Sequence, residues 1–278
     1  MMMHNSSVID NKAEISKNVK IGPFCYVGPN VKLDENVELI SNVHIEGHTK
    51  IGKGTRIFPF ASIGTQPQDL KFKGEKNSLE IGENNLIREY VTINPGTEGG
   101  GSKTVIGNNC LLMISSHVAH DCKIGNNVII ANNVPLGGHV TIEDSVVIGG
   151  NSAVQQFTRI GRLAMIGGMT GVLKDVIPFG LSIGNRNYLQ GLNLIGLRRH
   201  KYDNQKIMGL DKAFKDIFDS KNLHENLGKI NGEYKDNELT VFRSELKDID
   251  ITFSDESLVT TGSDSVRLML ICNFTNVN

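Results

Sequence analysis

The sequence contains no tryptophan, and only 11 phenylalanines and 5 tyrosines are found among its 278 residues. It also lacks an excess of charge: 29 lysines and arginines face 30 aspartates and glutamates, for a formal net charge of −1. This balance excludes a broadly basic nucleic-acid-binding protein. No apolar run reaches the roughly 18 residues that a membrane-spanning helix needs. The first residues do not form the basic-then-apolar pattern of a secretory signal, so we expect no export.

Cysteine is scarce as well, and its placement carries no metal signature. The four cysteines, Cys25, Cys110, Cys122 and Cys272, are scattered along the chain without the close pairing of a zinc site. Reduced thiols in a cytoplasmic protein are the expectation that fits this spacing best.

Isoleucine, valine, asparagine and glycine are abundant instead. The chain has 29 Ile, 21 Val, 28 Asn and 30 Gly. A core built from β-branched aliphatic residues favours strands, and this much glycine and asparagine favours many sharp turns.

An aliphatic residue recurs every six positions along most of the chain. The first run extends from Ile15 to Ile63, and the same spacing continues at Ile81, Ile87 and Ile93. After a slip of one residue the spacing resumes at Ile106 and continues unbroken to Val172. A period of six is neither helical nor a simple strand alternation, and it indicates a short strand followed by a turn.

Three such strand–turn units make a triangular coil of 18 residues, and coils stack at the spacing of paired strands, about 4.8 Å. The aliphatic residues point inward, and asparagine and glycine occupy the corners. The asparagine pairs 108/126, 109/127 and 133/151 are therefore expected on neighbouring coils, as turn residues that tolerate a positive φ.

Two segments interrupt the repeat. Residues 64–80 form a polar excursion that keeps the spacing, because Ile63 and Ile81 are 18 positions apart, and residues 94–105 form a glycine-rich loop where the spacing shifts. Loops that project from a rigid solenoid often carry functional groups, although each of these can equally be a tolerated surface insertion.

The repeat ends after Val172, and Pro178-Phe179-Gly180 marks a boundary. We expect the solenoid to cover residues 1–183 and a helical domain to cover 184–278, with helix concentrated in about 188–245 and an atypical, extended or irregular tail beyond. Apolar residues at helical spacing between 207 and 218 predict a helix capped by Asp203 or Asn204.

The residues best suited to chemistry share one column of this solenoid. His120, Gly138 and Gln156 follow one another at intervals of one predicted coil, so they are expected one below another on three successive coils. His139 is likewise one coil from Asp121. Together they offer a base, a glycine amide and polar side chains, which could remove a hydroxyl proton and stabilise a thioester oxyanion. A histidine pair can also be merely structural.

The hexapeptide pattern resembles that of the left-handed parallel β-helix acyltransferases, and five motifs make the resemblance specific. They are similar to motifs of the UDP-N-acetylglucosamine O-acyltransferases of lipid A synthesis. The motifs are QDLK (68–71), HVAHDC (117–122), GGH (137–139), AVQQF (153–157) and GLNLIGLRR (191–199). The resemblance covers roughly residues 10–215. It implies a mainly β protein, a left-handed parallel β-helix with a small α-helical C-terminal domain, assembled as a homotrimer with sites between subunits.

The resemblance also implies the reaction and its residues. A 3-hydroxyacyl group would pass directly from an acyl-carrier-protein thioester to the 3-OH of UDP-N-acetylglucosamine, with no cofactor and no metal. His120 would be the general base, Asp121 its electrostatic support and the Gly138 N–H the oxyanion donor. The remaining contacts implied are Gln68, Asp69, Lys71, His117, His139 and Gln156 for the sugar and its phosphates, Asn193 and Arg199 for the uridine diphosphate, and Gly168 for a long acyl chain. Gly168 can equally be a simple turn glycine.

Several residues depart from the family pattern. Gln155 and Asn94 stand where histidine is usual, and Ile195 replaces an acidic residue often used for uracil binding. The tail after about residue 245 also lacks the family's usual ending. Gln155 removes any role for a second histidine at that position, and Ile195 leaves the nucleotide contacts partly open.

Three alternatives accompany this interpretation. A related N-acyltransferase would act on a 3-amino sugar, but that family carries a uridine-binding domain for which there is no room before Ile15. A γ-type carbonic anhydrase would bind zinc through His117, His120 and His139. A purely structural solenoid would tolerate changes throughout the polar column. The sequence leaves both the oxygen or nitrogen acceptor and the acyl-chain length open.

Overall fold

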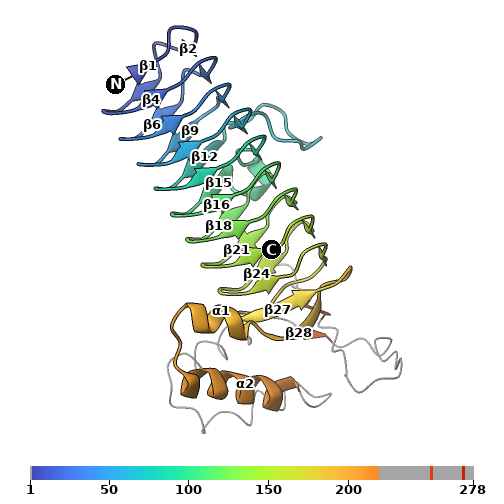
Figure 1. The fold of residues 1–278 in the computed structure, drawn as a ribbon. Coiled ribbons are helices and arrows are strands. Elements are labelled where there is room, and N and C mark those ends of the chain that lie inside the picture. The colour runs from blue at the N-terminus through green and yellow to red at the C-terminus, as the bar shows by residue number, and fades with distance from the viewer. Residues whose placement is uncertain (1, 219–250, 253–270, 273–278) are drawn as a thin grey trace.

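The protein is a triangular solenoid whose three faces are parallel β-sheets (Figure 1). The computed structural model describes residues 2–218, 251–252 and 271–272. Most strands are two residues long, and turns join each strand to the next face. Successive strands pair with the strand one coil away, so Leu111 pairs with Ile129 and Ile129 with Val147. This register is the one predicted from the hexad spacing.

The faces are named here sheets A, B and C, in the order in which the chain visits them. Sheet A contains β1 (Met2–Met3), β4 (Lys20–Ile21), β7 (Glu38–Leu39), β10 (Arg56–Ile57), β13 (Leu86–Ile87), β16 (Leu111–Leu112), β19 (Ile129–Ile130), β22 (Val147–Ile148), β25 (Met165–Ile166), β27 (Gly180–Ile183) and β28 (Tyr188–Leu192). Sheet B contains β2 (Val8–Ile9), β5 (Tyr26–Val27), β8 (His44–Ile45), β11 (Ser62–Ile63), β14 (Thr92–Ile93), β17 (His117–Val118), β20 (Pro135–Leu136), β23 (Ala153–Val154) and β26 (Gly171–Val172). Sheet C contains β3 (Glu14–Ile15), β6 (Lys32–Leu33), β9 (Thr49–Ile51), β12 (Ser78–Ile81), β15 (Lys103–Ile106), β18 (Lys123–Ile124), β21 (Thr141–Ile142) and β24 (Arg159–Ile160).

The hexad aliphatic residues form a continuous core along the axis. Ile45, Ile87 and Ile130 are fully buried, and they belong to one hydrophobic cluster that runs through the coils. Burial of each such side chain contributes roughly 1.5–3 kcal/mol, which is how a narrow solenoid without indole rings gains its stability.

Four of the six asparagines in the predicted pairs adopt the expected positive φ, whereas Asn108 and Asn126 do not. Asn109 and Asn127 adopt left-handed conformations, with φ of 56° and 57°. Neighbouring asparagines also bond from coil to coil, for example from Asn108 Nδ2 to Asn126 Oδ1 at 2.8 Å. The predicted stacking of these pairs is confirmed.

The first interruption differs from the prediction in one respect. Ile51 pairs with Ile81, whereas an uninterrupted coil would bring Asp69 opposite it, so the segment between β11 and β12 carries two additional hexads. Ile81 therefore belongs to sheet C, whereas Ile63 belongs to sheet B. The hexad spacing survives because the insertion is a multiple of six, but the two residues do not share a face.

Both interruptions leave the solenoid at the same corner. We call the turns that lead from sheet B to sheet C the B–C edge, and those from sheet A to sheet B the A–B edge. The excursion after Ile63 and the loop after Ile93 both start on the B–C edge. The short 3₁₀ helix η1 (Glu98–Gly100) lies in the second of them. Long segments therefore collect along one edge, where the turns 119–122, 137–140 and 155–158 also lie.

The end of the solenoid differs from the predicted domain division. β28 pairs antiparallel with β27 and extends sheet A, so a boundary at 183/184 would cut through a hairpin. The helices follow it: α1 (Leu194–Arg199) and α2 (Asn204–Phe218). Asp203 caps α2, because its Oδ1 accepts the N–H of Lys206 at 2.8 Å. The rest of the predicted helical region, 219–245, lies outside the described residues.

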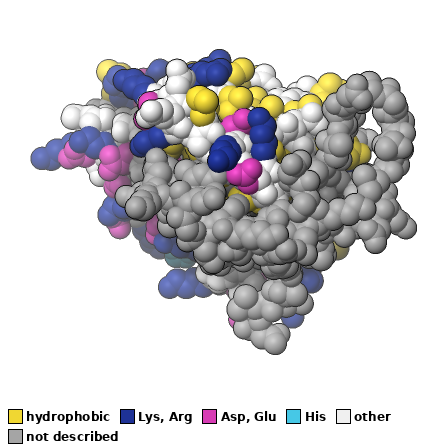
Figure 2. Space-filling model, turned by 90° about the horizontal axis from the view of Figure 1, so that it is seen from below, with side chains coloured by type: hydrophobic (Ala, Val, Ile, Leu, Met, Phe, Trp, Pro, Cys, Tyr) yellow, Lys and Arg dark blue, Asp and Glu magenta, His cyan; other side chains and the backbone are white. Residues whose placement is uncertain are grey.

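Beyond it, the structure describes only two short strands, β29 (Ile251–Thr252) and β30 (Ile271–Cys272), which pair antiparallel. Within the described ranges, neither helix has the length and apolar composition to cross a membrane. Seen from the helical end, basic and acidic side chains lie next to one another on the described surface (Figure 2).

Candidate active site

The polar column predicted from the coil spacing lies on the B–C edge. His120 follows β17, Gly138 follows β20 and Gln156 follows β23, which are consecutive strands of sheet B. Backbone bonds connect these turns: the N–H of His139 donates to the carbonyl of His120, and that of Phe157 to the carbonyl of Gly138, both at 3.0 Å. The 18-residue spacing in the sequence therefore places the three residues correctly relative to one another.

His120 and Asp121 form a buried pair. The Nδ1 atom of His120 lies 2.8 Å from Asp121 Oδ2, and the exposed fractions of the two side chains are 8% and 0%. A carboxylate can only accept, so Nδ1 carries the proton. The lone pair is then on Nε2, which is the form of imidazole that can accept a proton from a substrate.

The glycine at position 138 makes room for the imidazole of His120. A Cβ at this position would lie 2.5 Å from His120 Cε1 and 2.6 Å from Nε2, which is closer than side chains approach one another. Among the described residues no hydrogen-bond acceptor is found for the Gly138 N–H. A backbone donor without a partner thus lies beside the nitrogen that can act as a base, as an oxyanion site requires.

Two further histidines surround this pair as neutral rings. Burial lowers the pKa of His117 below its usual value, and the neighbouring His120 adds to the effect. Its Nδ1 lies 2.7 Å from Thr92 Oγ1. Burial also lowers the pKa of His139, although the Asp121 carboxylate acts in the opposite direction. Both rings therefore suit hydrogen bonding to a polar substrate rather than charge pairing at neutral pH.

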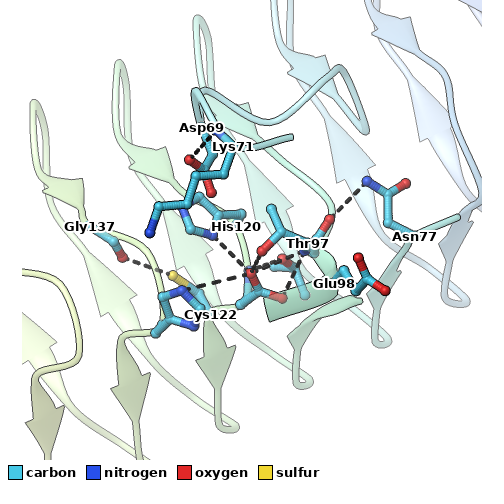
Figure 3. A network of polar contacts seen from close by, with 12 residues as sticks. Asp69, Lys71, Asn77, Thr97, Glu98, His120, Cys122 and Gly137 are labelled. Atoms are coloured by element: carbon cyan, nitrogen blue, oxygen red, sulfur yellow. Dashed lines mark hydrogen bonds and ion pairs between the residues drawn. The ribbon is translucent and has the colours of Figure 1, made fainter. Parts of the chain in front are cut away.

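The first excursion brings Asp69 and Lys71 to the same place. Figure 3 draws both side chains beside His120, and both act electrostatically on the pKa of His139. Asp69 Oδ1 accepts the backbone N–H of Lys71 at 2.9 Å, which fixes the local turn. Gln68, next to Asp69, and Gln156, in the polar column, are also exposed. The predicted sugar and phosphate contacts are thus on the B–C edge with the base.

The thiol of Cys122, two residues from His120, cannot take part as a nucleophile. Its side chain is fully buried, and burial raises the thiol pKa to about 12. The Sγ also lies 3.2 Å from the carbonyl oxygen of Gly137, to which it donates (Figure 3). Cys110 is similar, with a pKa of about 11. Only Cys122 lies on the B–C edge, because Cys110 is in a turn from sheet C to sheet A, and thiolate chemistry would need a lower pKa than either thiol has.

Other predicted residues lie away from the polar column of the B–C edge within one chain. Gly168 is exposed on the A–B edge, across sheet B from His120. Asn193 is the N-cap of α1: its Oδ1 accepts the Gly196 N–H at 3.0 Å, and its Nδ2 donates to the Leu163 carbonyl at 2.9 Å. Arg199 is exposed at the end of that helix. The amide of Asn193 is therefore engaged in capping, which the resemblance did not imply.

One cluster of metal-ligating side chains is present among the described residues, and it differs from the three histidines considered for a zinc enzyme. His120, Asp121 and His139 each offer a ligand atom, all within 4.8 Å of one another. His117 is not a member of this cluster. Asp121 already accepts hydrogen bonds from His120 and from Thr97, so its oxygens are engaged without a metal.

Two contacts of this site were missed in the sequence. Phe157 stacks on His139, with ring centroids 4.3 Å apart and planes 7° apart. Phe157 follows His139 by one coil, so the 18-residue spacing could have predicted this contact. Thr97 bonds to Asp121 from the second loop, which departs from the period, and no spacing pointed to it.

Comparisons with known proteins agree with this geometry. Residues 103–138 match the family "Bacterial transferase hexapeptide (six repeats)", and residues 175–248 match "Udp N-acetylglucosamine O-acyltransferase; Domain 2". A relative from Rhizobium johnstonii, named acyl-(acyl-carrier-protein)–UDP-N-acetylglucosamine O-acyltransferase, is 49% identical over 240 residues, covering 86% of this chain and 88% of its own. A relative of the same name from Helicobacter acinonychis is 61% identical over 194 residues, covering 70% and 72%.

A solved structure gives the same result. The UDP-N-acetylglucosamine acyltransferase from Bacteroides fragilis superimposes with a TM-score of 0.86 at 39% identity, over 88% of this chain and 97% of that one. The hexapeptide solenoid and the polar column on its edge define a left-handed parallel β-helix acyltransferase. More closely, the chain belongs to the UDP-N-acetylglucosamine O-acyltransferase family. This membership replaces the carbonic anhydrase and structural-solenoid alternatives.

Proposed function

We propose that the protein transfers a 3-hydroxyacyl group from an acyl-carrier-protein thioester to the 3-OH of UDP-N-acetylglucosamine, the first step of lipid A synthesis. The observation that carries the proposal is the His120–Asp121 pair, which leaves Nε2 of His120 as a base beside the Gly138 N–H. It stands within a chain whose relatives are named for this reaction.

In the proposed mechanism, Nε2 of His120 takes the proton of the sugar hydroxyl as its oxygen attacks the thioester carbonyl. The new C–O bond forms while the carbonyl electrons move to the oxygen, and the Gly138 N–H donates to that oxyanion. The C–S bond then breaks, and the imidazolium returns its proton to the departing thiolate. Asp121 stabilises the imidazolium between these steps. No acyl-enzyme is needed, in agreement with the high thiol pKa of Cys122.

The acceptor would be held by the polar groups around this pair. Lys71 supplies a cation suited to the phosphates. Asp69, Gln68, His117, His139 and Gln156 supply hydrogen bonds for the sugar. Two departures from the family pattern lie in different surroundings. Asn94 is buried and its Nδ2 donates to the Thr65 carbonyl at 3.1 Å, whereas Gln155 is exposed. Asn94 therefore supports the excursion.

We also propose a homotrimer, with sheet B of each chain facing the threefold axis. Such packing sets the A–B edge of one chain against the B–C edge of the next. Gly168 of one chain would then approach the polar column around His120 of its neighbour, although Gly168 and His120 lie on opposite sides of sheet B within a chain. Along the axis they are three strand spacings apart, about 14 Å, which suits a groove for a long acyl chain. Contacts of Arg199 and Asn193 with the uridine diphosphate would likewise require the assembly. Asn193 could use only the hydrogen-bonding capacity of its amide that the helix cap does not occupy.

The cytoplasm is the proposed location. Cys25, Cys110 and Cys122 are free, buried thiols, which fits a reducing compartment.

One assay tests the proposal. Purified protein is incubated with UDP-N-acetylglucosamine and a panel of 3-hydroxyacyl-carrier proteins of different length, and the acylated nucleotide sugar is measured. We expect turnover with the wild type and a loss of about 10²–10⁴-fold in His120→Ala. His48→Ala, an exposed histidine near the same edge, is the matched control and should keep full turnover.

Near-wild-type turnover in a folded His120→Ala trimer would show that another group is the base. A parallel assay with the 3-amino analogue separates the O-acyltransferase from the N-acyltransferase alternative. Faster acylation of the amino sugar would favour the second.

A further inference from the structure

The carboxylate of Asp121 is enclosed by the second insertion, residues 94–105. Thr97 contacts it through two donors: the backbone N–H donates to Oδ1 at 2.9 Å and to Oδ2 at 3.1 Å, and the hydroxyl Oγ1 donates to Oδ2 at 2.6 Å. Thr97 is itself buried, with 5% of its surface exposed. Charge-assisted bonds of this length are the strong ones, and buried pairs of this kind are not screened by water.

The fit around the carboxylate is close. A Cβ on Gly100 would overlap Asp121 Cγ, so the backbone of η1 packs directly against the carboxyl group. On the other side, the backbone N–H of Asp121 donates to Thr104 Oγ1 at 2.8 Å. Both ends of the insertion therefore contact this one residue.

The insertion is in turn braced by the first excursion. Asn77 Nδ2 donates to the Gly96 carbonyl at 2.8 Å (Figure 3). The N–H of Ser78 donates to the Ser102 carbonyl at 2.9 Å. The position of Thr97 is thus fixed by contacts that do not involve Asp121. A hydroxyl held in this way can determine the orientation of the carboxylate.

We propose that Thr97 is a positioning residue for acyl transfer: it fixes the Asp121 carboxylate, which holds the His120 imidazole in the form with its proton on Nδ1. The inference rests on the proposed function for its kinetic consequence, but the contacts stand without it. Thr97 reaches no reacting atom. It acts through Asp121, and its hydroxyl is the group that does so.

Three variants separate this role from simple packing. Thr97→Val keeps the shape and the backbone N–H but removes the hydroxyl donor, Thr97→Ser keeps the donor, and Thr97→Ala removes it without added bulk. Thr55→Val is the control, because Thr55 is also buried and its hydroxyl donates to the Gly82 carbonyl at 3.0 Å, in a turn from sheet C to sheet A rather than on this edge.

We expect kcat to fall roughly tenfold to a hundredfold in Thr97→Val and Thr97→Ala, with KM for the sugar nucleotide nearly unchanged. Thr97→Ser should restore kcat to within about threefold, and Thr55→Val should leave it intact. A kcat within twofold of the wild type in both Val and Ala variants, or a Ser variant as slow as Val, would overturn the proposal.

A spectroscopic measurement reads the same contact without turnover. In protein labelled with ¹⁵N-histidine, the Nδ1–H of His120, bonded to a buried carboxylate, should give a slowly exchanging downfield proton resonance. We expect this resonance to broaden or vanish in Thr97→Val and Thr97→Ala and to persist in Thr97→Ser. Persistence in all variants would contradict the proposal. If the wild type lacked transferase activity, the proposed function would fail while this measurement still decided the role of Thr97.

Discussion

At the scale of single residues, the site depends on how little space surrounds the His120 imidazole. Asp121 lies on one side at hydrogen-bond distance, and the main chain of Gly138 lies on the other. His139 meets the ring edge-on, with centroids 5.0 Å apart. The orientation of the base is therefore set by packing as well as by charge, which is how a buried imidazole can be preorganised for proton transfer.

A methyl group on Gly138 should displace this ring. We expect Gly138→Ala to lower kcat by more than about tenfold, because its Cβ would lie 2.5 Å from His120 Cε1, while the backbone N–H is kept. Gly28→Ala on the same edge is the matched control, since its Cβ would make ordinary contacts of 3.4 Å with Glu46. Steady-state kinetics on both variants decide the matter; equal activity would mean that the ring has room to move.

Asp175 shows a different consequence of burial. It follows Phe157 by one coil on the same edge, and desolvation raises its pKa from 3.8 to about 6. The N–H of Arg159 donates to Oδ1 at 2.6 Å, but Oδ2 has no hydrogen-bond partner among the described residues. A group with a raised pKa binds its proton more tightly in the folded state, so stability is lost as the pH rises from about 4 through about 6.

Asp175→Asn should therefore stabilise the protein above pH 6. The rise in pKa corresponds to about 3 kcal/mol as an upper limit. We expect a higher melting temperature for the variant at pH 8 and a difference that shrinks toward pH 4, measured by thermal unfolding at each pH. Asp10→Asn, which removes a less buried carboxylate, is the control. A variant that is no more stable than the wild type at pH 8 would contradict this account of Asp175.

The residue positions that the sequence predicted correctly are those governed by the period. His120, Gly138, Gln156 and the His139–Asp121 pair all follow from the coil spacing, because stacking fixes one residue when its neighbour is known. Thr97 could not be found in this way. Its place depends on a loop whose course is set by contacts such as that of Asn77 with Gly96, which no local pattern encodes.

At the scale of elements, the two insertions behave as attachments to an uninterrupted solenoid. The ladder continues across the first one, since Ile57 pairs with Ile87 and Ile63 with Ile93. The hexad spacing alone could not reveal which face follows an insertion, because two additional hexads and a complete coil both preserve a multiple of six. Likewise, helical spacing identified α2, whereas the β27–β28 hairpin has neither the hexad nor the helical period.

Removal of residues 66–77 should restore the plain repeat. The deletion takes out two hexads and leaves Ile63 and Ile81 six positions apart, so the ladder can close without a change of register. We expect a folded protein with a similar circular dichroism spectrum but with activity reduced at least about tenfold, because Asp69 and Lys71 are lost with the segment. Asp69→Ala with Lys71→Ala is the companion variant. A deletion protein that retains full activity would remove this excursion from the site.

At the scale of the whole molecule, exposed aromatic residues on the A–B edge support the proposed assembly. Phe24, Phe60 and Tyr90 have exposed fractions of 67%, 51% and 54%. Each has a positive φ, between 58° and 65°, which costs a bulky residue of order 1 kcal/mol or more at corners where asparagine is common elsewhere. Phe60 and Tyr90 also stack, with centroids 5.0 Å apart. Burial against a neighbouring chain would offset that cost.

Phe60→Asn combined with Tyr90→Asn should weaken the trimer without harming the single chain. Asparagine tolerates the left-handed conformation, so the turns remain, while apolar surface available to a partner is lost. We expect sedimentation analysis to give three chains for the wild type and smaller species for the variant at the same concentration. Leu86→Asn, on sheet A, is the control and should remain a trimer. A double variant that stays fully trimeric would place the interface elsewhere.

The stacking of coils has a further consequence for where motion can occur. Each coil is held only by the coils above and below it, so opening begins at a free end and proceeds coil by coil. The first coil has one neighbour and exposed side chains at Met2 and Val8. The turns that carry His120 and Gly138 lie well inside the stack, with paired strands on both sides. Backbone amide protons should therefore exchange quickly at the N-terminal coil and slowly around the base, and fraying of the solenoid would leave the catalytic geometry intact.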